Sequence, residues 1–225
     1  MGDDNIIVQK PLSELIADQL KKDIWSESIK FGDRLLETDL AEHFDVSRST
    51  IREAFKILET EELIVSKARK GTYVADFTEQ DLNEIIELRT LIESQAFKKA
   101  MPKLDEQQLE KLKKITEQMK IKADEHDWNG LFDLDMEFHS FVVNLCGNAR
   151  IVRIYNSLQV QIRTFLMHLD QYYSSPQSFY REHEELLQTL ISKDKDAVVK
   201  RVSNHIEYVE EKLLGVNDEN RVNAN

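Results

Sequence analysis

The chain has 225 residues, 41% of them hydrophobic, and a formal net charge of −12 at pH 7, which suits one large or two small globular domains rather than a general nucleic-acid binder. A single cysteine, Cys146, excludes an internal disulfide and favours a reducing compartment. Because there is no secretory signal and no apolar run of about 20 residues, we expect a cytoplasmic protein with no membrane contact.

The N-terminal third has the pattern of a winged helix-turn-helix. Apolar periodicity predicts three helices and then two short strands, over residues 11–28, 37–44, 47–60, 63–66 and 72–75. A basic loop with one glycine separates the two strands. Three helices and a β-hairpin in this order predict a DNA-binding domain over residues 1–77, in which the loop forms the wing.

The third predicted helix has the features of a DNA-reading helix. Arg48 and Arg52 are four residues apart, so both project from one face. An arginine fork can bond O6 and N7 of one guanine, and hydroxyls and free amides at a helix start can hold phosphates. The candidate DNA-binding residues are Ser47, Arg48, Ser49, Thr50 and Arg52 in the helix and Arg69, Lys70 and Gly71 in the wing.

The charge of this domain restricts how it can bind DNA. Residues 1–77 hold 11 Lys and Arg against 16 Asp and Glu, so attraction to phosphates in general is expected to be weak. Sequence-specific binding then requires that the few cations gather on one face. A solvated helix face is the alternative explanation of Arg48 and Arg52, and the order of the surrounding elements argues against it.

The rest of the chain shows only helical periodicity. Six helices are predicted, over residues 79–100, 105–125, 127–146, 150–168, 177–191 and 194–214. We therefore expect a mainly α protein, with a helical bundle over residues 78–215. The polar residues 216–225 are expected to be disordered.

A second group of candidate residues lies in the helical domain. Asp135 and His139 are four residues apart on an apolar helix face, and His183 and His205 have similar apolar settings. Burying such groups is costly unless they have partners. One Asp and three His can hold a divalent transition metal and leave one or two coordination positions open. A buried His–Asp hydrogen bond is the plainer explanation.

Several motifs together resemble the bacterial GntR family of transcription factors, in its FadR-like subfamily with an FCD ligand domain. The matching segments are residues 36–41, 46–54, 58–59 and 71–74 in the DNA-binding half, and 87–89, 91–93, 135–139, 147–148, 182–183 and 204–205 in the helical half. The short ligand domain is more similar to the six-helix VanR type than to the seven-helix type. One departure is Thr38, since many relatives have a basic residue there or beside it.

This resemblance implies a homodimeric, ligand-responsive repressor of a palindromic operator in double-stranded DNA. It implies that Asp135, His139, His183 and His205 bind a divalent metal, with zinc as the first expectation and nickel or manganese as alternatives. The metal would help to hold a small organic acid as effector, and an arginine would take the rest of its charge. Arg89 and Arg163 are the candidates, although a surface ion pair explains each of them equally well.

Two other functions are compatible with the helical domain. One is a metal-dependent hydrolase, because the pair His126 and Asp127 superficially resembles the paired ligands of helical phosphohydrolases. No partner His or Asp lies at a supporting spacing and no nucleophile is evident, so we do not expect an enzyme. The other is a metal site that only stabilises the bundle.

Overall fold

The computed structural model describes residues 10–167 and 174–222, and the side chains up to residue 208. The chain divides into two compact units, Met1–Asp76 and Phe77–Asn225. This division falls one residue before the predicted domain boundary.

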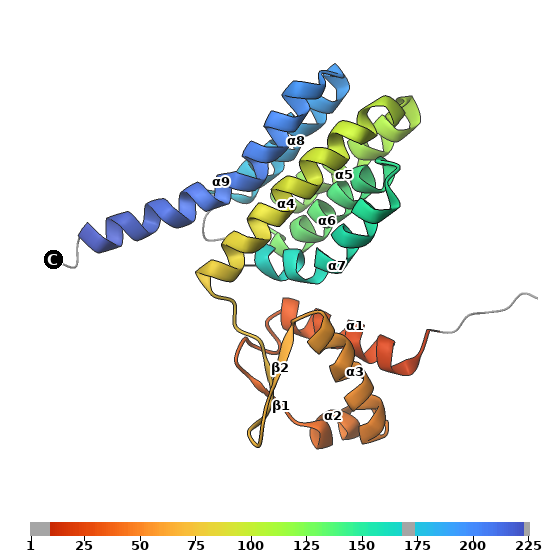
Figure 1. Ribbon diagram of the computed structural model, residues 1–225, viewed down its shortest axis with the longest axis vertical. Helices are drawn as coiled ribbons and strands as arrows, with labels where there is room; N and C mark the ends of the chain where they lie inside the picture. Colours follow the sequence, from red (N-terminus) through yellow and green to blue (C-terminus); the bar gives the residue numbers. More distant parts are fainter. Residues whose placement is uncertain (1–9, 168–173, 223–225) are drawn as a thin grey trace, which may run out of the picture. The chain divides into compact units, whose positions relative to one another are not determined.

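The N-terminal unit has three helices and a small antiparallel sheet (Figure 1). Its elements are α1 (Leu12–Trp25), β1 (Arg34–Leu35), α2 (Glu37–His43), α3 (Arg48–Thr60), β2 (Ile64–Lys67) and β3 (Gly71–Val74). The sheet order is β1-β3-β2. The predicted helices and hairpin are confirmed, whereas β1 was not predicted because its two residues become a strand only by pairing with Tyr73 and Thr72.

A compact apolar core holds the reading helix in place. Helices α1 and α3 pack against each other, and Leu20 and Ile24 of α1 and Ile51 and Leu58 of α3 are each at most 1% exposed. The turn between α2 and α3 passes through Asp45 at φ +52°, a left-handed conformation that Asp tolerates. The buried face of α3 therefore fixes the orientation of its polar face.

The helical unit is a bundle of six α-helices among the described residues, as predicted. They are α4 (Glu79–Ala100), α5 (Glu106–Asp124), α6 (Trp128–Leu145), α7 (Ala149–Leu166), α8 (Pro176–Ser192) and α9 (Lys195–Val222), with the short 3-10 helix η1 (Met101–Lys103) after α4. The prediction of a disordered tail is wrong for residues 216–222, because α9 continues through them. That segment contains neither proline nor glycine, and Gly215 just before it costs the helix only about 1 kcal/mol. Residues 223–225 and His168 lie outside the described residues.

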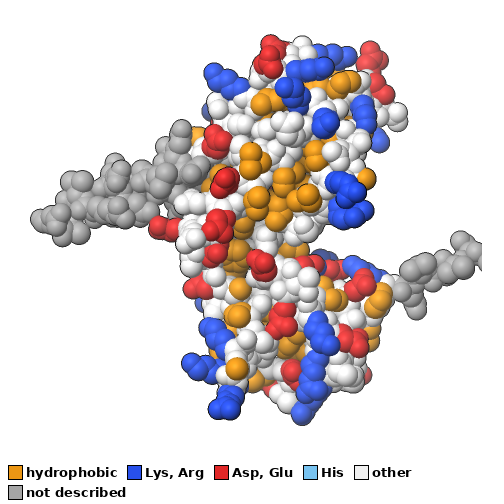
Figure 2. Space-filling model, in the orientation of Figure 1, with side chains coloured by type: hydrophobic (Ala, Val, Ile, Leu, Met, Phe, Trp, Pro, Cys, Tyr) orange, Lys and Arg blue, Asp and Glu red, His pale blue; other side chains and the backbone are white. Residues whose placement is uncertain are grey.

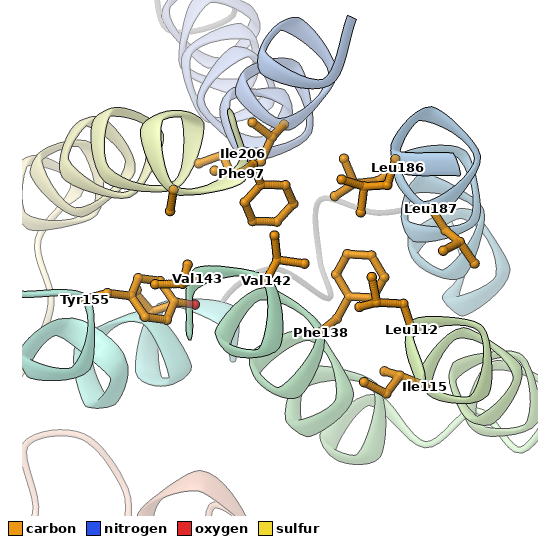
Figure 3. Close-up of a cluster of buried hydrophobic side chains, with 14 of the residues drawn as sticks. Phe97, Leu112, Ile115, Phe138, Val142, Val143, Tyr155, Leu186, Leu187 and Ile206 are labelled. Carbon is orange, nitrogen blue, oxygen red and sulfur yellow. The ribbon is translucent and has the colours of Figure 1, made fainter. Parts of the chain in front are cut away.

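Helix α6 is the centre of this bundle, since it contacts α4, α5, α7 and α8. Figure 3 shows Phe138 and Val142 of α6 among side chains from several other helices, including Phe97 of α4, Leu112 of α5 and Leu186 of α8. All five of these side chains are fully buried. A polar side chain on the same face of α6 is therefore enclosed in the core and must find its partners there.

Candidate metal centre and DNA-reading helix

The four predicted metal ligands come together inside the helical unit. Asp135 and His139 lie on α6, His183 on α8 and His205 on α9, and each is at most 4% exposed. Each offers one ligand atom, and these four atoms all lie within 4.8 Å of one another. Three helices thus bring three imidazoles and a carboxylate to one buried point.

The outer contacts of two histidines determine which nitrogen faces that point. Nδ1 of His183 donates to the carbonyl oxygen of Phe179 at 3.0 Å, and Nδ1 of His139 donates to the carboxylate of Glu93. In a neutral imidazole the other nitrogen, Nε2, then carries a lone pair. Nε2 of His183 lies 2.9 Å from Oδ1 of Asp135, so two acceptors face each other. A divalent cation between them would satisfy both, which makes the donor set a good fit to a metal.

The third histidine is held in the neutral form. Its Nε2 lies 3.2 Å from Nε2 of His139, and its Nδ1 lies 3.8 Å from the carboxylate of Glu182. Burial lowers the pKa of His205 to about 3, and the neighbouring His183 adds to the effect. A neutral imidazole is the form that binds a metal, so His205 does not have to lose a proton near pH 7.

Helix α4 reaches the cluster through an ion pair. Nε of Arg89 donates to Glu93 at 2.7 Å, and Nη2 of the same arginine donates to Oδ2 of Asp135 at 3.1 Å. Burial alone would raise the pKa of Asp135, but the charge of Arg89 together with the contacts of His139 and His183 holds that pKa well below its usual value. Arg89, which was predicted to bind an effector, is therefore a buried partner of a candidate metal ligand, and Oδ1 of Asp135 is left to face the cluster.

Glu93 is the residue of this network that received no role from the sequence. It is fully buried and touches both Arg89 and His139. Burial raises the pKa of its carboxyl, but the charge of Arg89 and the contacts with His139 together outweigh that effect and lower the pKa below the ordinary value. The available signal was its spacing, because Arg89 and Glu93 share the helix face of Ile86 and Phe97.

Arg163, the other candidate effector residue, makes its described contacts elsewhere. Its Nε donates to Asp133 at 2.8 Å, its Nη2 donates to Oδ1 of Asn129 at 3.1 Å, and its guanidinium lies over the ring of Phe132. Asp133 is 69% exposed and lies on a different face of α6 from Asp135. The structure thus places Arg163 in a bridge between α7 and α6.

In the N-terminal unit, the predicted reading helix begins with a hydroxyl cap. The Oγ of Ser47 accepts from the backbone N–H of Thr50 at 3.2 Å and lies 2.7 Å from the Oγ of Ser49. Arg48 and Arg52 are both exposed. Because Ser47 caps the helix, the hydroxyls and the two arginines stay together at the accessible start of α3.

The wing presents its basic residues on a tight turn. Arg69 adopts φ +60°, and the carbonyl oxygen of Lys70 accepts from the hydroxyl of Tyr73 at 3.0 Å. Gly71 has φ +116°, and a Cβ there would lie 2.9 Å from Nε of Arg34. Arg69 and Lys70 are exposed, so the turn displays two cations at the tip of the hairpin.

His126 and Asp127, the basis of the hydrolase alternative, have ordinary structural roles. Asp127 caps α6, since its side chain accepts from the backbone N–H of Gly130 at 2.9 Å, and it pairs with Lys122. His126 is exposed and forms the left-handed turn before that cap, at φ +57°. Neither residue belongs to the cluster of Asp135.

None of the helices in the described part of the chain combines the length and the apolar character that crossing a bilayer requires.

Relatives of this chain are named regulators. The gluconate operon transcriptional repressor of Bacillus licheniformis is 30% identical over 203 residues, which cover 88% of this chain and 83% of the relative. The repressor of the same name from Bacillus subtilis (strain 168) is also 30% identical, with the same coverage.

The fold also has counterparts among solved structures. A putative transcriptional regulator GntR from Rhodococcus sp. RHA1 superimposes with a TM-score of 0.78 at 24% identity. The match covers 90% of this chain and 97% of that one. It supports the arrangement of a winged helix followed by a helical bundle.

Both units match known families. Residues 12–74 match "Bacterial regulatory proteins, gntR family", and residues 84–208 match the FCD domain. The two matches follow the division of the chain into a DNA-binding unit and a helical unit. The chain therefore belongs to the GntR family of bacterial regulatory proteins, with an FCD domain as its helical unit, and is a transcriptional regulator rather than an enzyme.

Proposed function

We propose that this regulator is a homodimeric repressor whose affinity for a palindromic operator is controlled by a small carboxylate bound at a divalent metal. The observation that carries the proposal is the buried convergence of Asp135, His139, His183 and His205 in a chain that also contains a DNA-binding unit. A regulator needs both a reading head and a site whose occupancy can change, and these residues supply the second.

Zinc, nickel or manganese is the proposed metal. Three neutral imidazoles and one carboxylate suit all of these ions and leave one or two coordination positions open. Glu93 and the carbonyl of Phe179 orient two of the imidazoles, as outer partners commonly do at metal sites. Arg89 occupies the second oxygen of Asp135, which favours binding through Oδ1 alone.

A carboxylate effector follows from the charge of the network. Without a metal, the buried groups carry one positive charge on Arg89 and negative charges on Glu93 and Asp135. A divalent ion would make the network net positive, so an anion that fills an open coordination position would be favoured. The Bacillus relatives are named for a gluconate operon, and gluconate is a hydroxy acid of this class.

Two copies of α3 are the proposed operator contacts. In helix-turn-helix dimers, the two reading helices enter successive major grooves about 34–36 Å apart. Arg48 and Arg52 would meet base edges, while Ser47, Ser49 and Thr50 would hold phosphates at the start of the helix. Arg69, Lys70 and Gly71 would bring the wing against the adjacent backbone or minor groove.

The homodimer is supported by apolar side chains on the surface of the helical unit. Leu88 and Leu91 on α4 and Ile154 on α7 are 45%, 60% and 52% exposed. Helices α4 and α7 pack against each other, and Figure 2 shows hydrophobic side chains gathered over α4 and the helices beside it. Such patches commonly mark contacts between proteins.

Helix α4 offers a physical link between the two functions. It follows the N-terminal unit directly in the chain, and its Arg89 and Glu93 contact the candidate ligands Asp135 and His139. An effector that shifts these ligands would also shift α4. The effect on DNA requires that the effector bind two conformations of the protein with different affinity.

The test combines metal analysis with DNA binding. The purified protein would be measured against duplex DNA from upstream of its own gene, with and without sugar acids, hydroxy acids, dicarboxylates and aromatic acids. We expect one class to change operator affinity by about 5–150-fold, a typical range for coupled sites, and His139→Ala to abolish the response. A response that persists in His139→Ala would contradict the metal-bound effector.

A purely structural metal site is the second candidate, and the buried contacts of Arg89 with Glu93 and Asp135 favour it. Those contacts tie α4 to α6 and stabilise the bundle whether or not an effector binds. In that case a chelator would lower the melting temperature, while no carboxylate would change DNA affinity.

A further inference from the structure

An ion pair joins the two helices of the helix-turn-helix at the predicted DNA surface. Nε of Arg52 on α3 donates to Oε2 of Glu37 on α2 at 2.8 Å. The arginine side chain is nevertheless 62% exposed, whereas that of Glu37 is 32% exposed. The contact thus holds the inner part of the guanidinium and leaves its outer part accessible.

The way in which Arg52 is held differs from the setting of Arg48. Within the described part of the chain, Glu37 is the hydrogen-bonding partner of Arg52, and it contacts Nε alone. The two terminal nitrogens therefore stay available side by side. Arg48, one turn earlier on α3, has no such brace among the described residues, although it is exposed on the same helix.

This geometry matters for base recognition. A free arginine side chain samples many rotamers, and ordering one costs as much as about 2 kcal/mol. An arginine that is already held by Nε loses less freedom when its two terminal nitrogens bond O6 and N7 of a guanine. The carboxylate of Glu37 also repels DNA phosphates. This repulsion weakens binding to sequences in which Arg52 finds no guanine to compensate for it.

We propose that Glu37 is a specificity-determining positioning residue, which holds Arg52 by Nε so that its two terminal nitrogens recognise one guanine end-on. The inference rests on the proposed role of α3 in reading the operator. It adds a residue of α2 that makes no base contact of its own and acts through Arg52. Glu37 would thereby raise the affinity for the correct sequence and lower the affinity for others.

The test uses the full-length protein and a duplex that it selects from a random library. Each guanine of that duplex would be replaced in turn by 7-deazaguanine, which keeps base pairing and lacks the N7 acceptor. We expect at least one position in each half-site to lower wild-type affinity, and Arg52→Ala to be insensitive to replacement at one of these positions. Glu37→Ala should lose the same discrimination and bind the selected duplex about 5–30-fold more weakly, within the range of a lost bidentate contact.

Three further variants separate positioning from other roles. Glu42→Ala removes an equal charge from the exposed side of α2 and should leave the discrimination intact. Glu37→Gln keeps an oxygen that can accept a hydrogen bond from Nε of Arg52, so it should retain most of the discrimination. Glu37→Ala combined with Arg52→Ala should discriminate no less than Arg52→Ala alone, because the effect of Glu37 requires Arg52.

The outcomes distinguish this proposal from the proposed function. If Arg52→Ala loses the discrimination while Glu37→Ala keeps it, Arg52 reads the guanine unaided and the positioning role is wrong. If Glu37→Ala weakens selected and random duplexes equally and lowers the melting temperature, the ion pair only joins α2 to α3. If Arg52→Ala itself discriminates like the wild type, both the base contact and its positioning are overturned.

Discussion

Nε2 of His183 lies 2.9 Å from Oδ1 of Asp135, so α8 and α6 meet in the core through two atoms that both accept hydrogen bonds. Nδ1 of His183 is already committed to the carbonyl oxygen of Phe179. When the imidazole of His183 is neutral, this contact is unfavourable unless a cation lies between the two atoms. Metal binding and the stability of the helical unit are therefore expected to be coupled.

The first prediction concerns metal content. The wild-type protein should hold about one zinc, nickel or manganese ion per chain, as expected for a four-ligand site, and His139→Ala should hold almost none. Losing an outer partner alone typically weakens metal binding about 10–100-fold, so losing a ligand should cost more. Elemental analysis after dialysis measures the content. His43→Ala removes an exposed histidine from α2 and is the matched control. Equal metal in both variants would contradict the site.

The second prediction concerns the buried ion pair of α4. Glu93→Ala removes the partner of Nε of Arg89 and of Nδ1 of His139 inside the core, and should lower the free energy of unfolding by about 3–5 kcal/mol. Urea denaturation measures the loss. Glu87→Ala removes the same charge from an exposed position on the same helix and should change stability by less than about 0.5 kcal/mol. Similar effects of the two substitutions would show that Glu93 does not support the network.

The third prediction is a pH dependence at the start of α6. The backbone N–H of Gly130 and the charge of Lys122 lower the pKa of Asp127, so its stabilising effect is present above the ordinary pKa of 3.8 and is lost as the pH falls through the lower folded value. Asp127→Ala should cost about 1 kcal/mol near neutral pH, and the difference should shrink in acid.

Asp127→Asn is the control for that experiment, because it keeps the cap oxygen and has no proton to gain. Its stability relative to the wild type should rise as the pH falls below the ordinary pKa of an aspartate. Thermal unfolding at a series of pH values measures both variants. A constant difference between the wild type and Asp127→Ala across the acid range would contradict the role of the charge.

The fourth prediction concerns the wing. Arg69→Ala and Lys70→Ala should each weaken selected and random duplexes to the same degree, and should lower the slope of log affinity against log salt by about 1. The reason is that wing cations are expected to contact phosphates rather than bases. Fluorescence anisotropy over a salt series measures the slope. Lys98→Ala removes an exposed positive charge from α4 and should leave the slope unchanged.

The sequence predicted most of the fold because its signals are local. Helical periodicity in the bundle and the order of helices and strands in the first unit both follow from neighbouring residues, and the helix bounds agree within a few residues. Strand β1 was missed because Arg34 and Leu35 are strand residues only beside β3. The end of α9 was missed because polar composition alone does not stop a helix.

The candidate site was predicted in its ligands and not in their surroundings. Asp135 and His139 stand out because they interrupt an apolar helix face, and His183 and His205 share that property. What surrounds them depends on contacts between helices that spacing does not encode. The sequence left Arg89 as either an effector-binding residue or part of a surface ion pair, and its burial against Glu93 became visible only when α4 was placed beside α6.

The order of the elements has a consequence for incomplete synthesis. Every candidate DNA contact precedes residue 76, whereas His205 lies on α9, the last helix of the described residues. A ribosome that stops before α9 releases a product with the whole reading head and an unfinished ligand cluster. A nonsense mutation in the codons of α9 is therefore expected to yield a DNA-binding unit whose helical unit lacks both His205 and the packing of α9 against α4, whereas one in α3 removes the DNA-reading helix itself.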